Sequence, residues 1–209
     1  MAAALGAKPL DAEKSVNLSL GAVVRFGAAN LTVDAYRIKV RDRIVLSENL
    51  TQDDVREFLT RQGFIGVGGG RFFINGVDTT TDGVDVVLNW PWNSGATGKF
   101  DFTVAANFNK TDVTKVPETA QLSALKSAPP LFARLNILSF EEGQPRNKQS
   151  ASVNWKLGQL GATLRATRYG RVLSPNANPA LDVVLHPKTL VDLEARYALT
   201  QKLGLALGA

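Results

Sequence analysis

The sequence predicts an all-β protein: a segment of an antiparallel up-and-down transmembrane β-barrel, about eight strands of a larger barrel, with short periplasmic turns and long extracellular loops. Two patterns indicate this class. Apolar and polar residues alternate with a period of two in several segments, and the connections between these segments alternate in length. The mean hydropathy of -0.04 fits the same class, because lumen-facing polar residues cancel lipid-facing apolar ones in an average.

The first predicted strand covers residues 16–26, where apolar residues alternate with Asn17, Ser19 and Arg25. This alternation predicts one apolar face. A short break at residues 27–30 then separates it from the next strand.

The second predicted strand begins at Leu31, and its apolar positions shift from odd to even numbers after Ala35. Either a β-bulge lies near Ala35, or the strand leaves the membrane there. Basic side chains are costly in lipid, so we expect those that follow to face a barrel lumen or water. These candidate lumen-facing residues are Arg37, Lys39, Arg41 and Arg43. They could attract an anionic ligand, although a charged wall paired with acidic neighbours is the favoured interpretation.

The clearest later strands cover residues 84–90, 100–109, 151–157 and 191–199, and weaker alternation covers residues 160–171 and 203–207. Together they give about eight strands, each near the ~10 residues that a tilted membrane strand needs. Four acidic residues at the polar positions complete the candidate lumen-facing set: Asp85, Asp101, Asp192 and Glu194.

The connections alternate between short and long along the whole chain. Short turns fall at residues 27–30, 92–98, 158–159 and 200–202, and long connections fall at residues 47–70, 111–148 and 174–187. All tight turns would then lie at one end of the sheet and all long loops at the other, which is typical of outer-membrane barrels.

The first long loop is expected to contain a short helix. Thr51 can cap it, Asp53 and Asp54 suit its positive N-terminus, and Gly63 can end it. Its expected apolar stripe consists of Val55, Phe58 and Leu59. In the second long loop, Pro129 and Pro130 exclude regular structure from the middle.

Aromatic side chains gather near the predicted short turns. Trp90, Trp92, Phe100 and Trp155 are candidate membrane-interface residues, because an amphipathic ring is favourable at that depth. The alternative is that the tryptophan rings cover the end of a soluble β-core.

No residue pattern indicates an enzyme, a cofactor or a metal site. His186 is the only histidine, so it is expected to be a solvated loop residue. The spacing of Asp78, Asp82 and Asp85 is not that of a calcium loop, and the glycines at 68–70 precede a strand instead of opening a phosphate-binding helix. The formal net charge of +5 is spread along the chain, which disfavours nucleic acid as a partner.

Several segments resemble one family. LTVDAYRIKVRDRIVL at 31–46 and RFFINGVDTTTDGVDVVLNW at 71–90 resemble the β-barrel of TonB-dependent outer-membrane receptors. The segments EKSVNLSLG at 13–21, EEGQPRNK at 141–148 and TLVDLEARYALTQKLGLALGA at 189–209 resemble the same late barrel region, so the resemblance covers nearly the entire chain.

The resemblance implies active uptake of a scarce nutrient, such as a siderophore–iron complex, at the cell outer membrane. Such barrels have about 22 strands and an N-terminal plug, so residues 1–209 are expected to be a partial barrel domain without the plug. The implied partners are outer-membrane lipid, a small-molecule cargo, and the TonB energy-transducing complex through an N-terminal part outside this chain. We expect no transport by the segment alone. The rival classes are a soluble β-sandwich binding module and a small closed eight-stranded outer-membrane barrel.

Overall fold

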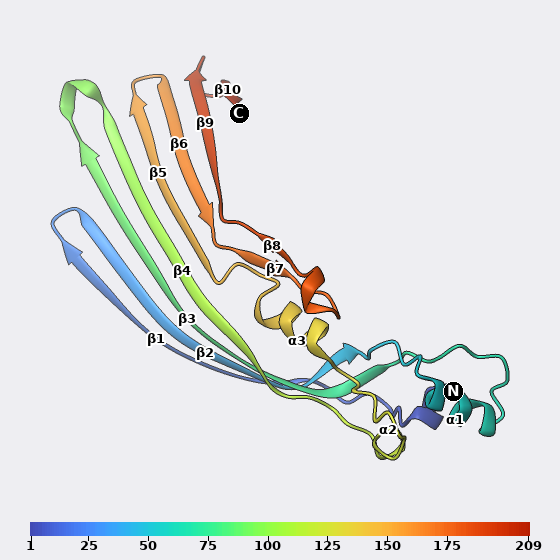
Figure 1. Ribbon diagram of the computed structural model, residues 1–209. Helices are drawn as coiled ribbons and strands as arrows, with labels where there is room; N and C mark the ends of the chain where they lie inside the picture. The colour runs from blue at the N-terminus through green and yellow to red at the C-terminus, as the bar shows by residue number, and fades with distance from the viewer.

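One antiparallel sheet of eight strands dominates the computed structural model, which describes residues 1–209 (Figure 1). Strands that follow each other in the chain are neighbours in this sheet, in the order β1-β2-β3-β4-β5-β6-β9-β10. The strands are β1 (Lys14–Phe26), β2 (Ala29–Leu46), β3 (Phe73–Asn93), β4 (Lys99–Lys115), β5 (Asn147–Leu157), β6 (Leu160–Tyr169), β9 (Lys188–Ala198) and β10 (Gly204–Gly208). The prediction of about eight up-and-down strands is confirmed.

The sheet is open. Strands β1 and β10 lie at its two edges and do not pair with each other, which excludes a small closed barrel. The only other sheet is a two-stranded hairpin of β7 (Val172–Ser174) and β8 (Val183–Leu185) in the third long loop. A sandwich needs a second sheet packed over the first, and no such layer is present.

Tight turns and long connections lie at opposite ends of the sheet, as predicted (Figure 1). Gly27 and Gly158 adopt positive φ values of 60° and 59° in two of the tight turns, a conformation that favours glycine. The 3₁₀ segment η2 (Gly95–Thr97) lies in a third turn. Helices and 3₁₀ segments of the long connections are α1 (Asp53–Arg61), α2 (Ala120–Ser123), α3 (Arg134–Glu141) and η3 (Pro179–Leu181).

Helix α1 lies where the sequence placed a helix. Val55 and Leu59 are fully buried, and Gly63 follows the helix with a φ of 87°. The expected cap was wrong: the N-cap is Gln52, which makes no side-chain capping bond, so Thr51 lies one residue before the cap. No helix of the structure is both long enough and apolar enough to span a bilayer.

The buried apolar residues are concentrated at the long-loop end. The larger group, which we call the loop core, joins η1 (Ala3–Leu5), the first long loop and the second long loop. Its buried members are Leu5, Leu50, Val55, Leu59, Phe72, Leu122 and Leu131. A smaller group of Val45, Val77 and Phe132 packs beside α3. The wide part of the sheet contributes no comparable core, so the sheet is a single layer.

The regular pairing of β2 is interrupted near Asp42 and not near Ala35. The pairing of β2 with β3 is unbroken from Asn30 to Val40; its register shifts between Val40 and Arg43 and again between Arg43 and Val45. Asp42 lies at this shift with a φ of 55°. Of the two alternatives for the change of pattern near Ala35, the bulge is therefore wrong, and the alternation of side chains continues through Ala35 without a change of face. The other alternative, that the strand leaves the membrane there, stays a prediction.

Candidate functional site

The sheet has one apolar face, defined by the pairing of the strands. Residues paired across neighbouring strands point to the same side of a sheet. One row of paired residues crosses seven strands and is entirely apolar: Val24, Leu31, Leu88, Val104, Ala151, Ala166 and Val191. The next row toward the tight turns is also apolar: Trp90, Phe102, Val153, Leu164 and Leu193. We call this side the apolar face.

The apolar face is exposed over its whole width. Leu18, Leu20 and Leu193 are 70%, 80% and 57% exposed, and no second layer covers them. Along β1 the apolar stretch from Val16 to Phe26 rises by about 33 Å, which is about 25 Å across a bilayer at a strand tilt near 40°. That height equals the apolar band of an outer-membrane barrel.

Aromatic rings border this band beside the tight turns. The ring centroids of Trp92 and Phe100 lie 5.3 Å apart, and those of Trp90 and Phe102 lie 5.4 Å apart. Nε1 of Trp155 donates a 2.8 Å hydrogen bond to the carbonyl oxygen of Thr97 in the β3–β4 turn. The four candidate interface aromatics, Trp90, Trp92, Phe100 and Trp155, thus share the apolar face and one end of the sheet.

The opposite side of the sheet carries the polar residues, and we call it the polar face. One of its rows contains Asp34, Asp85, Asn107, Lys148 and Tyr169. A hollow of about 650 Å³ lies on this side and is lined by residues of β2, β3, β4, β5, β6 and β9. A sheet can contribute so many strands to one hollow only where it curves around it, so the polar face is concave.

Hydrogen bonds connect three strands of the polar face. The side chain of Asn107 donates to Asp85 Oδ1 at 2.6 Å and to the Tyr36 hydroxyl at 3.2 Å. Asn109 in turn donates to Asn107 Oδ1 at 2.7 Å. The Tyr36 side chain crosses over β3 at Gly83, where the absence of a side chain leaves room for the phenol ring. The network holds Asp85 and Asn107, which both line the hollow, in fixed orientations.

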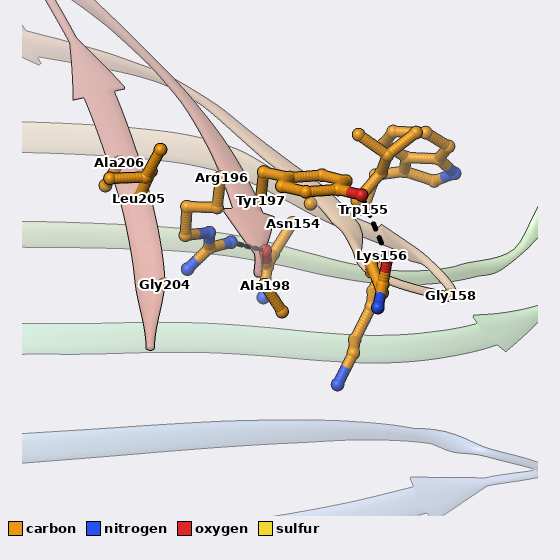
Figure 2. Close-up of a pocket in the computed structure, with 13 residues that line it drawn as sticks. Asn154, Trp155, Lys156, Gly158, Arg196, Tyr197, Ala198, Gly204, Leu205 and Ala206 are labelled. Carbon is orange, nitrogen blue, oxygen red and sulfur yellow. Dashed lines mark hydrogen bonds between the residues drawn. The ribbon is translucent and has the colours of Figure 1, made fainter. Parts of the chain in front are cut away.

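A second hollow of about 500 Å³ lies near the tight turns, between β5, β6, β9 and β10. Figure 2 shows the Arg196 side chain turned toward Asn154, with which it forms a hydrogen bond. Arg196 also donates to Thr163 Oγ1 at 2.9 Å and pairs with Glu194 at 3.2 Å. The hollow adjoins the edge strand β10, so it is open on that side.

The sequence-predicted polar residues divide between the two faces. Asp85, Asp101, Asp192 and Glu194 lie on the polar face. Arg43 also lies there, because the bulge at Asp42 reverses the alternation; its side chain donates to Thr79 Oγ1 at 3.1 Å.

The other three basic residues lie on the apolar side of the sheet, so of the two expected surroundings, lumen or water, the register of the strands disfavours the lumen. Every second residue of β2 from Leu31 onward points to the apolar side, and no bulge interrupts this alternation before Arg41. Arg37, Lys39 and Arg41 therefore lie on the same side as Leu31. They begin where the apolar band ends, so β2 extends beyond the band at this point. Arg37 pairs with Asp82, its NH2 lying 3.0 Å from Oδ2, whereas no carboxylate partner is present for Lys39 or Arg41.

The three aspartates whose spacing was compared with a calcium loop, Asp78, Asp82 and Asp85, do not form one site. Asp78 accepts a 2.9 Å hydrogen bond from the backbone N–H of Asp42, Asp82 pairs with Arg37, and Asp85 accepts from Asn107. No cluster of three or more potential metal ligands is present. Their separate partners give each carboxylate a structural role in the sheet.

The candidate set from the sequence omitted four members of the polar face: Asp34, Tyr36, Asn107 and Lys148. The signal was available in the strict period of two through residues 31–40, which puts Asp34 and Tyr36 on one side. It was obscured because Tyr36, Ile38 and Val40 are bulky apolar residues on the polar face, where they lie beyond the level of the band.

Polar contacts join the long loops. The carboxylate of Asp54 accepts hydrogen bonds from the backbone N–H and the hydroxyl of Ser127, at 2.7 and 2.8 Å, and these bonds hold its pKa below the usual range. Between the second and third loops, Arg134 NH1 lies 3.0 Å from Asp182 Oδ1. The Arg134 guanidinium and the backbone N–H of Asn176 lower the pKa of Asp182.

Comparisons with known proteins agree with this geometry. A family model described as "TonB dependent receptor-like, beta-barrel" matches residues 1–209. No curated protein sequence matches the chain. Among solved structures, the FrpB iron transporter from Neisseria meningitidis is similar over 97% of this chain and 26% of its own, with 13% identity and a TM-score of 0.64.

Two further solved structures are similar to a comparable degree. The ferric yersiniabactin uptake receptor FyuA from Yersinia pestis matches 95% of this chain and 24% of its own, with 15% identity and a TM-score of 0.59. The copper transporter OprC matches 94% of this chain and 25% of its own, with 14% identity and a TM-score of 0.58. At these identities the likeness shows the fold. The chain spans about a quarter of the length of these structures.

Proposed function

Because the chain belongs to the family of TonB-dependent receptor-like β-barrels, we propose that it is one continuous part of the barrel wall of an outer-membrane receptor for active nutrient uptake. The family consists of receptors and transporters and not of enzymes, so the wall would bind and guide cargo without covalent chemistry. The proposed location is the cell outer membrane, with the tight turns on the periplasmic side and the long loops outside.

The observation that carries this proposal is the division of the sheet into two faces. The apolar face would contact the acyl chains of the outer membrane, since an exposed apolar surface of this extent needs an apolar environment. The polar face, whose hollow is lined by Asp85 and by Asn107, the hydrogen-bond partner of Tyr36, would line the barrel lumen. Asp101, Asp192 and Glu194 would belong to the same lumenal wall.

A metal chelate is the cargo class that we propose, for example a ferric siderophore. Three proteins of similar structure are an iron transporter, a ferric yersiniabactin uptake receptor and a copper transporter. The polar face mixes carboxylates with cations such as Lys148 and Arg165, which suits a polar chelate of either charge. Energy would come from the TonB complex, through a part of the receptor outside this chain.

Uptake by the full-length receptor tests the proposal. The receptor would be expressed in a strain lacking its own siderophore receptors, and accumulation of ⁵⁵Fe supplied as ferric enterobactin, ferric yersiniabactin and ferric citrate would be measured. We expect uptake of at least one chelate, and its loss in an otherwise identical host that lacks TonB. Uptake that is unaffected by the loss of TonB would contradict the proposal, as would failure with these three and with copper, cobalamin and oligosaccharide probes.

A further inference from the structure

A basic pocket lies on the outer side of the sheet, between the second and third long loops. Its volume is about 480 Å³, and its lining includes Arg146, Arg168, Arg171 and His186 together with one acidic residue, Glu142. Arg168 comes from the end of β6, and the other four come from the loops that follow β4 and β6. We call it the outer basic pocket.

The register of the strands places this pocket on the apolar side of the sheet. Asn147, which lines it, pairs with Phe108, and Arg168 pairs with Gln149, the partner of Ala106. These positions belong to the apolar face. The outer basic pocket therefore lies on the side opposite to the hollow that contains Asp85, so cargo on the polar face cannot reach it through the sheet.

The depth of the pocket is set by the end of the apolar band on β6. Leu160, Ala162, Leu164 and Ala166 are the apolar-face residues of this strand, and Arg168 occupies the next position on the same side. Arg168 is thus about 7 Å along the strand beyond the last apolar residue. Arg37 holds the corresponding first position beyond the band on β2. Lipid headgroups lie at this depth when acyl chains cover the apolar face.

The charge of the pocket is not neutralised. Arg171 NH2 donates to Glu142 Oε2 at 2.7 Å, and Arg146 NH2 lies 3.8 Å from Oε1 of the same carboxylate. Arg168 has no carboxylate partner. With one carboxylate for three guanidinium groups, the pocket keeps donors and positive charge for an anion. Guanidinium groups are well suited to phosphate because they present paired N–H donors in one plane.

We propose that the outer basic pocket binds the phosphate of an anionic lipid headgroup in the leaflet on the long-loop side. This inference rests on the proposed function, since it requires the apolar face to contact a membrane. The occupant is a lipid and not a soluble anion, because Arg168 in the pocket lining directly follows Ala166 on the side of β6 that would contact acyl chains. A bound headgroup would contact both the second and the third long loop, and would thereby hold these loops together.

Native mass spectrometry of the full-length receptor, titrated with short-chain phosphatidic acid, tests this inference. The test variant is Arg168→Gln with Arg171→Gln. The matched control is Arg165→Gln with Arg196→Gln, which removes the same charge from the polar face. Near a membrane surface each cation contributes about fivefold in affinity, so we expect about 10- to 30-fold weaker binding by the test variant. The control should bind as the parent receptor does.

Two further arms complete the test. Short-chain phosphatidylcholine should bind the parent receptor weakly, and inorganic phosphate should not displace phosphatidic acid at equal concentration. Equal loss in the control variant, equal binding of phosphatidylcholine, or full displacement by inorganic phosphate would overturn the inference. If the double variant does not fold, as judged by heat-modifiable gel migration, Arg168→Gln alone should weaken binding about fivefold.

Quenching by brominated lipids separates this inference from the proposed function. Trp90, Trp92 and Trp155 lie on the apolar face, so lipids that carry bromine near the headgroup should quench the receptor's tryptophan fluorescence, and replacing these residues with Phe should remove the quenched component. Quenching without a preference for phosphate would overturn the headgroup site alone. No quenching by any brominated lipid would contradict the membrane placement itself.

Discussion

The Tyr36 side chain lies directly over Gly83 of the neighbouring strand. A Cβ atom at Gly83 would be 2.2 Å from Cζ of the Tyr36 ring, closer than any real contact. Because the ring crosses β3 at this point, the Tyr36 hydroxyl reaches Asn107 on the strand beyond. Because Gly83 on β3 has no side chain, polar groups on the two neighbouring strands, Tyr36 of β2 and Asn107 of β4, can form a hydrogen bond across it.

Replacing Gly83 with Val should displace the Tyr36 ring and break its hydrogen bond to Asn107. The crowding should lower the free energy of unfolding by about 1–3 kcal/mol, and it should also reduce cargo uptake. The measurement is denaturant unfolding of the full-length receptor in detergent, together with ⁵⁵Fe uptake. Gly204→Val is the control, because a Cβ there would lie 3.7 Å from its nearest neighbour. Equal effects of both variants would contradict the role of Gly83.

The ion pair of Arg134 and Asp182 should make the docking of the third loop depend on pH. Hydrogen bonding to Arg134 lowers the pKa of Asp182 in the folded loop. A lowered carboxyl pKa adds stability that is fully present above the unfolded pKa of about 3.9 and is lost as pH falls through the folded value. Hydrogen exchange of residues 134–141 and 172–185 should therefore speed up at acidic pH, after correction for intrinsic rates.

Asp182→Asn should give fast exchange in these segments at neutral pH and should remove the acid-induced increase. The control is Glu57→Gln, an exposed carboxylate of α1 without an ion-pair partner. A parent protein whose corrected exchange does not change with pH, or an Asp182 variant that behaves like the control, would show that the pair does not hold the loop.

The loop core should unfold separately from the sheet. Leu59 is fully buried there beside Leu122 and Leu5, which come from distant parts of the chain. Leu59→Ala should destabilise this unit by about 2–5 kcal/mol. Amide exchange should increase in residues 50–72 and 119–131 while β-sheet circular dichroism stays constant. The control is Ile65→Ala, because the Ile65 side chain is 83% exposed; it should change neither the amide exchange nor the circular dichroism. Loss of sheet signal with Leu59→Ala would mean that the two units unfold together.

The sequence predicted the strands and the alternation of turns and loops because both are local patterns. Period-two alternation identified β1, β4 and β9, and Gly63 was expected to end α1, which it follows with a φ of 87°. The packing of the loop core could not be predicted, since Leu5 and Leu122 meet only through tertiary contacts between distant segments.

The errors have equally physical causes. The faces of β2 were misassigned because Tyr36, Ile38 and Val40 are apolar yet lie on the polar face beyond the band. The bulge at Asp42 gave no signal, because aspartate tolerates a positive φ without a glycine or proline to mark it. Hairpin β7–β8 was read as loop, since its strands are only three residues long.

In the proposed function, one face of the sheet contacts lipid and the other lines an aqueous lumen. Leu88 and Asn89 are consecutive residues of β3 that point to opposite faces, and Leu88 lies midway along the apolar band. An arginine on the lipid side at mid-band costs about 2–4 kcal/mol, whereas an arginine on the lumen side is tolerated.

The most direct measurement compares the folding free energies of full-length receptors carrying Leu88→Arg or Asn89→Arg in lipid vesicles. We predict a loss of about 2–4 kcal/mol for Leu88→Arg and a change below about 1 kcal/mol for Asn89→Arg. Equal losses, or a larger loss for Asn89→Arg, would contradict the assignment of the two faces.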